Sequence, residues 1–281
     1  MKEYSAEFEI KIMCRIFGIS RSGYYFWKRN PLKKRQKEDA KLMPVIRQAF
    51  FSNRRVYGTR QIGAVLADMG IPIGRRRTRR LMHAQGLYPQ TAKAFRHATT
   101  TRSKNLQKTP DLLDRHFTAK APNRVWTGDI TRVFTLEGVL YLAVIEDLFS
   151  RMVVGWAMME QQTSTLVIIA FRMAWVQRRP QPGCIFHSDK GSQYDCLDFR
   201  SLLKEKQFRQ SMGSTGDCYD NAVTESAIGT IKSECCFNRV FRTRKEARNE
   251  LFDYIESFYN RVRRHSSIGY LSPEEFERRA N

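Results

Sequence analysis

Three carboxylates lie at positions in the sequence where a charged side chain is unexpected. Asp129 lies between Gly128 and Ile130 in the run RVWTGDITRVF, which is rich in the β-branched and aromatic residues typical of strands. Asp189 directly follows the short apolar run CIFH, and Glu225 lies one turn into a predicted helix. Burying a charge costs free energy unless the charge is paired or binds a cation. These positions therefore make the three carboxylates candidate ligands of a metal ion.

Phosphoryl transfer is the chemistry that suits such a set. Two divalent ions about 3.5–4 Å apart can clamp the attacking and leaving oxygens of a phosphodiester, and hard cations prefer carboxylate oxygens. The geometry and charge that the metal ions hold supply most of the acceleration. A salt bridge or a surface charge would explain any one of the three carboxylates alone. Together, in these strand and helix contexts, they favour a metal site.

The helix predicted over residues 221–237 presents two different faces. Its apolar residues form one stripe, which consists of Val223, Ala227, Ile231 and Cys235. Glu225 and Lys232 lie within roughly 20 degrees of each other on a second face. Gly229 lies between them and leaves room for a ligand, and Asp220 can cap the helix. The sequence thus predicts a carboxylate and an ammonium group side by side, with Lys232 holding a DNA phosphate.

Residues 122–281 show the pattern of an α/β domain. Three runs rich in β-branched and aromatic residues, RVWTGDITRVF, GVLYLAVIED and RMVVGWAMM, are separated by short turns and predict an antiparallel meander. A helix over 164–177, the run CIFHSD, a helix over 197–204 and the run FRQSM follow. Helices near 221–237 and 244–263 close the chain. This order predicts the RNase H-like fold, with three meander strands, two further strands and flanking helices.

The first thirty residues predict two short helices around a turn. EFEIKIMCRIF is periodic, Gly18 is a natural helix stop, and Ser20 can cap the second helix. This order fits a helix-turn-helix-like segment over residues 1–30. It fits equally a plain helical hairpin in which Tyr24, Tyr25 and Trp27 only pack.

A basic helical region is predicted over residues 31–88. A helix over 32–56 buries Val45, Ile46 and Phe50, and a helical pair follows from Tyr57 to Leu87. Five of the six residues from 75 to 80 are arginines. Phosphate contact explains them better than a solvated face does, although phosphate contacts carry no sequence information. The polar residues 89–121 predict a linker.

Charge is distributed unevenly along the 281 residues. Residues 1–120 hold 27 Lys and Arg against 8 Asp and Glu, a net charge of +19, whereas residues 121–281 hold 22 against 20, a net charge of +2. A basic field of this size attracts polyanions, with nucleic acid as the expected partner and an anionic membrane surface as the alternative.

No apolar run approaches the roughly 20 residues that cross a bilayer, and the N-terminus lacks a signal-peptide pattern. We therefore expect a cytoplasmic protein that joins the nucleoid when bound to DNA. Its six cysteines show no CxxC pair, which argues against zinc.

The ordered motifs resemble a known family. WTGDIT, HSDKGSQY and YDNAVTES occur together, 35 residues separate Asp189 from Glu225, and Lys232 lies seven residues beyond the glutamate. With CRIFGISRSGYYFW, YGTRQI, RRLMHAQGL and YNRVRRHSSIGYLSPEEFE, they make nearly the whole chain similar to the OrfB product of insertion-sequence-three-type bacterial transposases. That family is related to retroviral integrases. Two places depart from the family pattern: Arg132 replaces an aromatic residue, and Ala227 with Ile228 replaces an aromatic pair.

The resemblance implies a DDE triad of Asp129, Asp189 and Glu225 that binds Mg²⁺ or Mn²⁺, with two ions expected. It implies cleavage at the ends of the element and transfer of the freed 3′-hydroxyl into another phosphodiester. His187 could orient the site or be a hydrogen-bonded core histidine, and Trp126 and Trp156 are expected in the core. The residues that we expect to contact DNA are Arg75, Arg76, Arg77, Arg79, Arg80, Lys190, Gln193, Asn221, Lys232, Arg263 and Arg264.

The leading hypothesis is therefore a metal-dependent transposase acting on terminal inverted repeats and target DNA. The resemblance implies an upstream OrfA partner or a frameshift fusion, and a homo-multimer is expected on DNA. A catalytically decayed copy that represses the element is one alternative, and a general nuclease of the same fold is another. The intact triad argues against the repressor, and the large basic front half argues against a simple nuclease.

Overall fold

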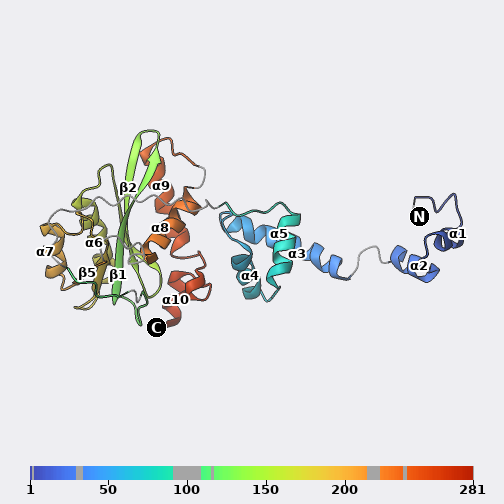
Figure 1. Cartoon of the computed structure of the whole chain (residues 1–281), viewed down its shortest axis with the longest axis horizontal. Helices are drawn as coiled ribbons and strands as arrows, with labels where there is room; N and C mark the ends of the chain where they lie inside the picture. Colours follow the sequence, from blue (N-terminus) through green and yellow to red (C-terminus); the bar gives the residue numbers. More distant parts are fainter. Residues whose placement is uncertain are drawn as a thin grey trace. The chain divides into compact units, whose positions relative to one another are not determined.

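The computed structural model describes residues 1, 3–29, 34–90, 109–114, 117–213, 222–236 and 239–280. The chain forms two compact units, Met1–Tyr88 and Pro89–Asn281, and each is described by itself (Figure 1). None of the helices in the described ranges is long and apolar enough to cross a membrane.

The first unit begins with two short helices, as predicted. α1 (Ile10–Ile16) ends before Gly18, whose φ of 62° is the left-handed conformation that glycine adopts without strain. α2 (Arg21–Arg29) is capped by Ser20, whose hydroxyl accepts a hydrogen bond of 3.0 Å from the N–H of Gly23. Tyr24 is buried between the two helices, whereas Tyr25 and Trp27 are partly exposed.

Three further helices pack together in the same unit. α3 (Lys34–Ser52), α4 (Thr59–Asp68) and α5 (Arg75–Ala84) bury Ile46 and Phe50 as predicted, with Val45 only half-buried. α3 ends four residues earlier than the sequence pattern suggests. Arg54 and Arg55, which follow it, both adopt positive φ angles that no helix can continue.

The second unit contains a five-stranded mixed sheet in the order β3-β2-β1-β4-β5. The predicted meander is present as β1 (Val125–Thr135), β2 (Gly138–Asp147) and β3 (Met152–Met159), which pair antiparallel. β4 (Ile185–Ser188) and β5 (Arg209–Met212) extend the sheet in parallel with β1. The sheet thus confirms the strand pattern that the sequence predicted.

Helices cover both faces of this sheet (Figure 1). α6 (Ser164–Arg178) and α7 (Leu197–Glu205) enclose an aromatic core around Trp126, Phe171 and Phe186. α8 (Ala222–Cys235) and α9 (Arg244–Asp253) pack against β1 and β2 on the other face. Because side chains alternate along a strand, Trp126 faces the first layer and Asp129 faces the layer that contains α8.

The chain does not close with the helix predicted over 244–263. α9 passes into a π-helical turn η1 (Tyr254–Tyr259), and a 3-10 turn η2 (Ser266–Ile268) leads to α10 (Pro273–Ala280), which the sequence analysis missed. Its start nevertheless carries helix signals, because Ser272 precedes Pro273 and two glutamates.

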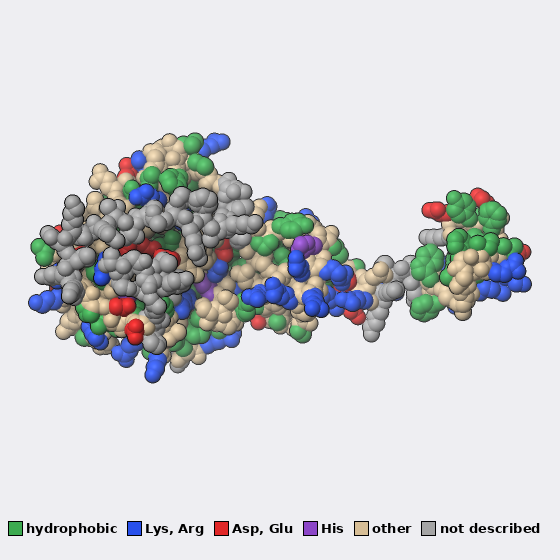
Figure 2. Space-filling model, in the orientation of Figure 1, with side chains coloured by type: hydrophobic (Ala, Val, Ile, Leu, Met, Phe, Trp, Pro, Cys, Tyr) green, Lys and Arg blue, Asp and Glu red, His purple; other side chains and the backbone are tan. Residues whose placement is uncertain are grey.

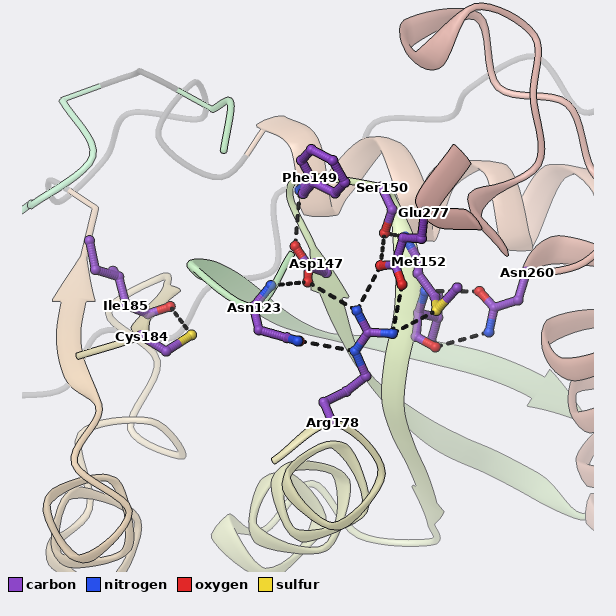
Figure 3. A network of polar contacts seen from close by, with 11 residues as sticks. Asn123, Asp147, Phe149, Ser150, Met152, Arg178, Cys184, Ile185, Asn260 and Glu277 are labelled. Atoms are coloured by element: carbon purple, nitrogen blue, oxygen red, sulfur yellow. Dashed lines mark hydrogen bonds and ion pairs between the residues drawn. The ribbon is translucent and has the colours of Figure 1, made fainter. Parts of the chain in front are cut away.

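An ionic network fixes α10 to the sheet (Figure 3). Glu277 of α10 accepts hydrogen bonds of 2.7 and 2.8 Å from Arg178 at the end of α6. Arg178 also lies 3.7 Å from Asp147, the last residue of β2, and donates to the side chain of Asn123. The guanidinium thus joins α6, β2 and α10.

Candidate active site

Asp129 and Asp189 lie at the same level of two neighbouring parallel strands. Gly128 of β1 is in register with Ser188, the last residue of β4, so Asp129 within β1 and Asp189 just after β4 are each the next residue along the chain. The N–H of Ile130 donates to Asp129 Oδ1 at 2.7 Å, and the N–H of Gly191 donates to Asp189 Oδ1 at 3.0 Å. Both side chains are half-buried. The sheet therefore brings two of the three predicted carboxylates together.

Glu225 reaches the same region from α8. This helix buries Thr224, Ala227 and Ile231 against the sheet and leaves Glu225 and Lys232 exposed, as its predicted faces require. α8 packs against β1, and the charge of Glu225 raises the pKa of Asp129 while that of Lys232 lowers it. The two substituted positions of the family pattern, Ala227 and Ile228, face the core rather than the carboxylates.

Negative charge accumulates at this point. Burial, together with the charges of Asp189 and Glu225, raises the pKa of Asp129 to about 8 against the opposing effects of the N–H of Ile130 and the Lys232 ammonium. Burial also raises the pKa of Asp189. Neighbouring carboxylates that resist ionisation together are relieved by a cation, so the donors fit a hard divalent ion.

The three carboxylates do not form a closed set of metal ligands in this structure. Among the residues that the structure describes, no three His, Cys, Asp or Glu side chains are close enough to hold one metal ion. The two aspartates are fixed by adjacent strands, whereas the position of Glu225 depends on how α8 lies on the sheet.

Three residues that the sequence analysis did not single out shape this site. Tyr194 is buried next to Gly128 and Gly191, and burial followed by the charges of Asp129 and Asp189 raises its pKa. A side chain at Gly128 would meet the ring of Phe186 at 2.7 Å. A side chain at Gly191 would meet Asp189 Oδ1 at 2.9 Å. Gly191 and Tyr194 belong to the string HSDKGSQY, whose small and aromatic residues were the available signal.

His187 is a hydrogen-bonded core histidine. It is fully buried, and its Nδ1 lies 2.8 Å from the hydroxyl of Ser211 and 3.8 Å from Asp111. When its ring is protonated, the positive charge would lower the pKa of Asp189 against the larger effect of burial. Of the two tryptophans expected in the core, Trp126 is fully buried, whereas Trp156 is half-buried and donates to Glu256 at 2.7 Å.

The other predicted DNA contacts near the site have varied surroundings. Lys190 is half-buried beside Asp189. Gln193 donates to the carbonyl of Gln162 at 3.3 Å, so it supports the loop around Asp189. Asn221 lies outside the described residues.

The five arginines of α5 divide into two groups. Arg77 donates to Asp39 at 2.8 Å and to Glu38 at 3.1 Å, and Arg80 also binds Asp39. Both acidic residues belong to α3, so the chain itself supplies part of the negative charge that balances these arginines. The other three arginines of α5, Arg75, Arg76 and Arg79, are exposed and make no such contact among the described residues. Blue Lys and Arg side chains gather on this helical group in Figure 2.

Arg263 and Arg264, which we expect to contact DNA, both have partners within the protein. Arg263 is 11% exposed and binds the carboxylate of Glu234 at 2.7 and 2.9 Å. Arg264 is half-buried and donates to the carbonyl of Tyr270 at 3.0 Å. Both guanidinium groups thus bind partners inside the protein, and DNA contact at these two residues stays a prediction.

Family models match three parts of the chain. An integrase core domain matches residues 119–218, a second integrase core domain model matches residues 206–273, and an HTH-like domain matches residues 36–95. The HTH-like match covers the described helices α3–α5 rather than α1 and α2, the pair that we expected to resemble a helix-turn-helix.

Solved structures of viral integrases show weaker similarity. The simian T-cell lymphotropic virus intasome, solved with a PP2A regulatory subunit, matches with a TM-score of 0.49 and 15% identity, covering 76% of this chain and 70% of that one. The catalytic core of HTLV-2 integrase, solved with magnesium, matches with a TM-score of 0.44 and 18% identity, covering 56% of this chain and 98% of that one.

Two curated relatives align over almost their full length. An uncharacterised 31 kDa protein of the insertion element IS600 from Shigella sonnei is 43% identical over 94% of this chain and 97% of its own length. The transposase InsF of insertion sequence IS3A from Escherichia coli (strain K12) is 39% identical over 99% of this chain and 96% of its own length. Together with the integrase core and the HTH-like domain, these alignments show that the chain belongs to the family of IS3-type insertion-sequence transposases.

Proposed function

We propose that Asp129, Asp189 and Glu225 form the centre at which this transposase cuts and joins DNA. A transposase with an integrase core is a DDE-type polynucleotidyl transferase, and an HTH-like domain binds DNA. One observation carries the assignment of residues. Asp129 lies within β1 at the level where the adjacent parallel strand β4 ends and Asp189 follows it, and the charge of Glu225 on α8 raises the pKa of Asp129.

The integrase core implies dependence on a divalent metal ion. We propose two Mg²⁺ ions held by the three carboxylates, with Mn²⁺ as a substitute. When bound, such ions stabilise the charge that develops on the phosphate and activate the attacking hydroxyl. Two observations support a divalent cation at this site. The neighbouring carboxylates raise the pKa of Asp129, and all three proposed ligands offer the oxygen donors that Mg²⁺ prefers.

The remaining site residues would orient the DNA. Lys232 is exposed on α8 beside Glu225 and would bind a phosphate next to the carboxylates. Tyr194 and Gly191 would keep Asp189 in place, the first by packing next to Gly191 and the second through its N–H. Arg75, Arg76 and Arg79 of α5 would bind the phosphates of the DNA duplex. We also propose three more specific partners: an upstream OrfA product or a fusion with it, the terminal inverted repeats of the element, and further copies of this chain.

Strand joining with labelled terminal-repeat DNA tests the proposal. The purified chain, with its upstream partner if the reaction needs one, should join 3′ ends to target DNA only when Mg²⁺ or Mn²⁺ is present. Asp129→Asn, Asp189→Asn and Glu225→Gln should each lower the rate by at least about 1,000-fold, since each removes a ligand of the metal ions whose positive charge would stabilise the transition state.

The controls separate the alternatives. Each variant should bind DNA as the parent chain does, because the carboxylates do not contribute to affinity through phosphate neutralisation. Binding by the parent chain without cleavage would indicate a repressor, and cleavage without joining would indicate a nuclease. Full activity of any of the three variants would contradict the assignment of that residue.

A further inference from the structure

A buried ion pair holds the C-terminal half of α8. Glu234 lies on the same helix as Glu225, about two and a half turns further along. Its side chain is only 5% exposed, and both of its oxygens are occupied. Arg263 donates to Oε1 at 2.7 Å and to Oε2 at 2.9 Å, and the hydroxyl of Tyr254 donates to Oε2 at 2.8 Å. This is a bidentate arrangement with a third donor, which fixes direction as well as distance.

The segment that supplies these donors is itself tied to the sheet. The side chain of Asn260 accepts a hydrogen bond of 2.9 Å from the N–H of Val153 and donates one of 2.9 Å to its carbonyl (Figure 3). Tyr259, which is almost fully buried, packs edge-on against His265 with ring centroids 4.7 Å apart. Residues 254–265 therefore connect α8 to β3, in the same sheet that carries the two aspartates.

We infer that Glu234 and Arg263 are positioning residues that set how far Glu225 stands from Asp129 and Asp189. This inference rests on the proposed function. The aspartates are placed by strand register, but Glu225 is placed by the tilt and rotation of α8 on the sheet. A helix anchored at one end transmits a small rotation there into a displacement at its other end. Among the described residues no three such side chains are close enough to hold one ion, so the position of Glu225 decides how well it can share an ion with the aspartates.

Only an arginine can supply this anchor. Its planar guanidinium presents two parallel N–H groups to a carboxylate, whereas a lysine offers a single point charge that does not fix orientation. Misplacement of a reacting group by about 1 Å can lower a rate about 100-fold. Replacing Arg263 by lysine should therefore keep the charge balance of the buried pair while loosening the position of Glu225.

The test measures the rate of strand joining by the full chain as a function of Mg²⁺ concentration. Arg263→Lys should lower the rate at a fixed low Mg²⁺ concentration by about 10- to 100-fold and raise the concentration needed for half of the maximal rate. Its affinity for terminal-repeat DNA in the absence of metal should not change. Arg261→Lys is the matched control, because Arg261 is exposed and lies only two residues away. Its Mg²⁺ requirement should equal that of the parent chain.

Tyr254→Phe is a gentler second variant if Arg263→Lys does not fold. It removes one of the three hydrogen bonds to Glu234 and leaves the ion pair intact, so it should raise the Mg²⁺ requirement in the same direction by a smaller factor. An unchanged Mg²⁺ requirement with only a lower melting temperature would overturn the inference in favour of a purely structural pair. Weaker DNA binding at an unchanged Mg²⁺ requirement would overturn it in favour of a DNA contact.

Glu225→Gln, assayed in parallel, separates this inference from the proposed function. If Glu225→Gln joins DNA as well as the parent chain does, the proposed function fails, and this inference fails with it. If Glu225→Gln is inactive while Arg263→Lys and Tyr254→Phe keep the Mg²⁺ requirement of the parent, only the positioning role fails.

Discussion

At the scale of single residues, the buried carboxylates differ in what balances their charge. Asp147 accepts hydrogen bonds from the N–H groups of Asn123 and Phe149 at 2.7 and 3.0 Å and lies 3.7 Å from Arg178. Glu146, its neighbour, is 1% exposed, and its Oε2 has no hydrogen-bond partner among the described residues. Burial raises the pKa of Glu146 to about 8, with Arg151 opposing and Asp147 reinforcing the shift.

This difference predicts how stability depends on pH. The folded chain keeps a proton on Glu146 up to a pH of about 8, whereas the unfolded chain releases it near its ordinary pKa of 4.5. The unfolded state therefore binds fewer protons in this range, and the free energy of unfolding falls as the pH rises from about 4.5 to about 8. Glu146→Gln removes this group from the titration, so its stability relative to the parent should rise with pH, by at most about 5 kcal/mol.

Thermal or denaturant unfolding of both chains from about pH 5 to about pH 9 checks this prediction. The difference between the two curves matters, because Asp147 titrates in both chains. Parallel curves would mean that Glu146 is ionised in the folded protein.

Residues of the site were predictable where their position in an element was unusual. A carboxylate inside an apolar strand, as at Asp129, is visible in the sequence without any knowledge of tertiary contacts. The partners of Arg77 and Arg263 were not visible, because Asp39 lies 38 residues before the first and Glu234 lies 29 residues before the second. The sequence therefore located the positive charge correctly, but it could not show which arginines form ion pairs within the folded protein.

At the scale of elements, α6 lies unusually close to β3. A side chain at Gly155 would meet the carbonyl oxygen of Ala170 and would lie 2.7 Å from the Cβ of Ala174, both on α6. Backbone cannot yield there as a flexible side chain would. Gly155→Ala should therefore lower the free energy of unfolding by about 3 kcal/mol through overpacking.

Gly229→Ala provides the matched control in α8. A side chain there meets nothing within 4 Å, and alanine favours a helix over glycine by about 1 kcal/mol. Chemical denaturation of both variants should show destabilisation for the first and unchanged or higher stability for the second. Equal stability of Gly155→Ala and the parent would show that the β3–α6 contact is looser than described.

The elements differ in how well the sequence predicted them. Alternation and turn residues indicated the meander, and its register follows from the short hairpin around Gly138. The helical segment after Arg244 was predicted as one continuous helix, but the π-helical turn at Tyr254–Tyr259 interrupts it. No local pattern predicts that turn, because it depends on burying Tyr254 and Tyr259 against α8 and the sheet.

At the scale of the whole molecule, positive charge and catalysis are separated along the chain. The net charge of +19 lies in residues 1–120, whereas the three carboxylates of the proposed site lie in the nearly neutral remainder. DNA affinity should therefore depend on residues that do not take part in the chemistry.

The salt dependence of DNA binding tests this separation. Alanine at Arg75, Arg76 or Arg79 should each reduce the slope of log affinity against log salt by about 0.9, since one phosphate contact is lost. Arg77→Ala should act differently, because Arg77 binds Asp39 and Glu38, and it should lower the stability of the α3–α5 group. Equal changes in slope for all four variants would contradict the division of the arginines.

The convergence of Asp129, Asp189 and Glu225 on shared metal ions is the central claim. Replacing Mg²⁺ by Fe²⁺ with ascorbate and peroxide, and mapping where the polypeptide is cut, measures it most directly, because hydroxyl radicals cleave backbone close to the metal. We predict cuts beside all three residues in the DNA-bound chain, and their joint loss in Asp129→Asn. Cuts near the two aspartates without any near Glu225, or cuts elsewhere that survive the substitution, would contradict the claim.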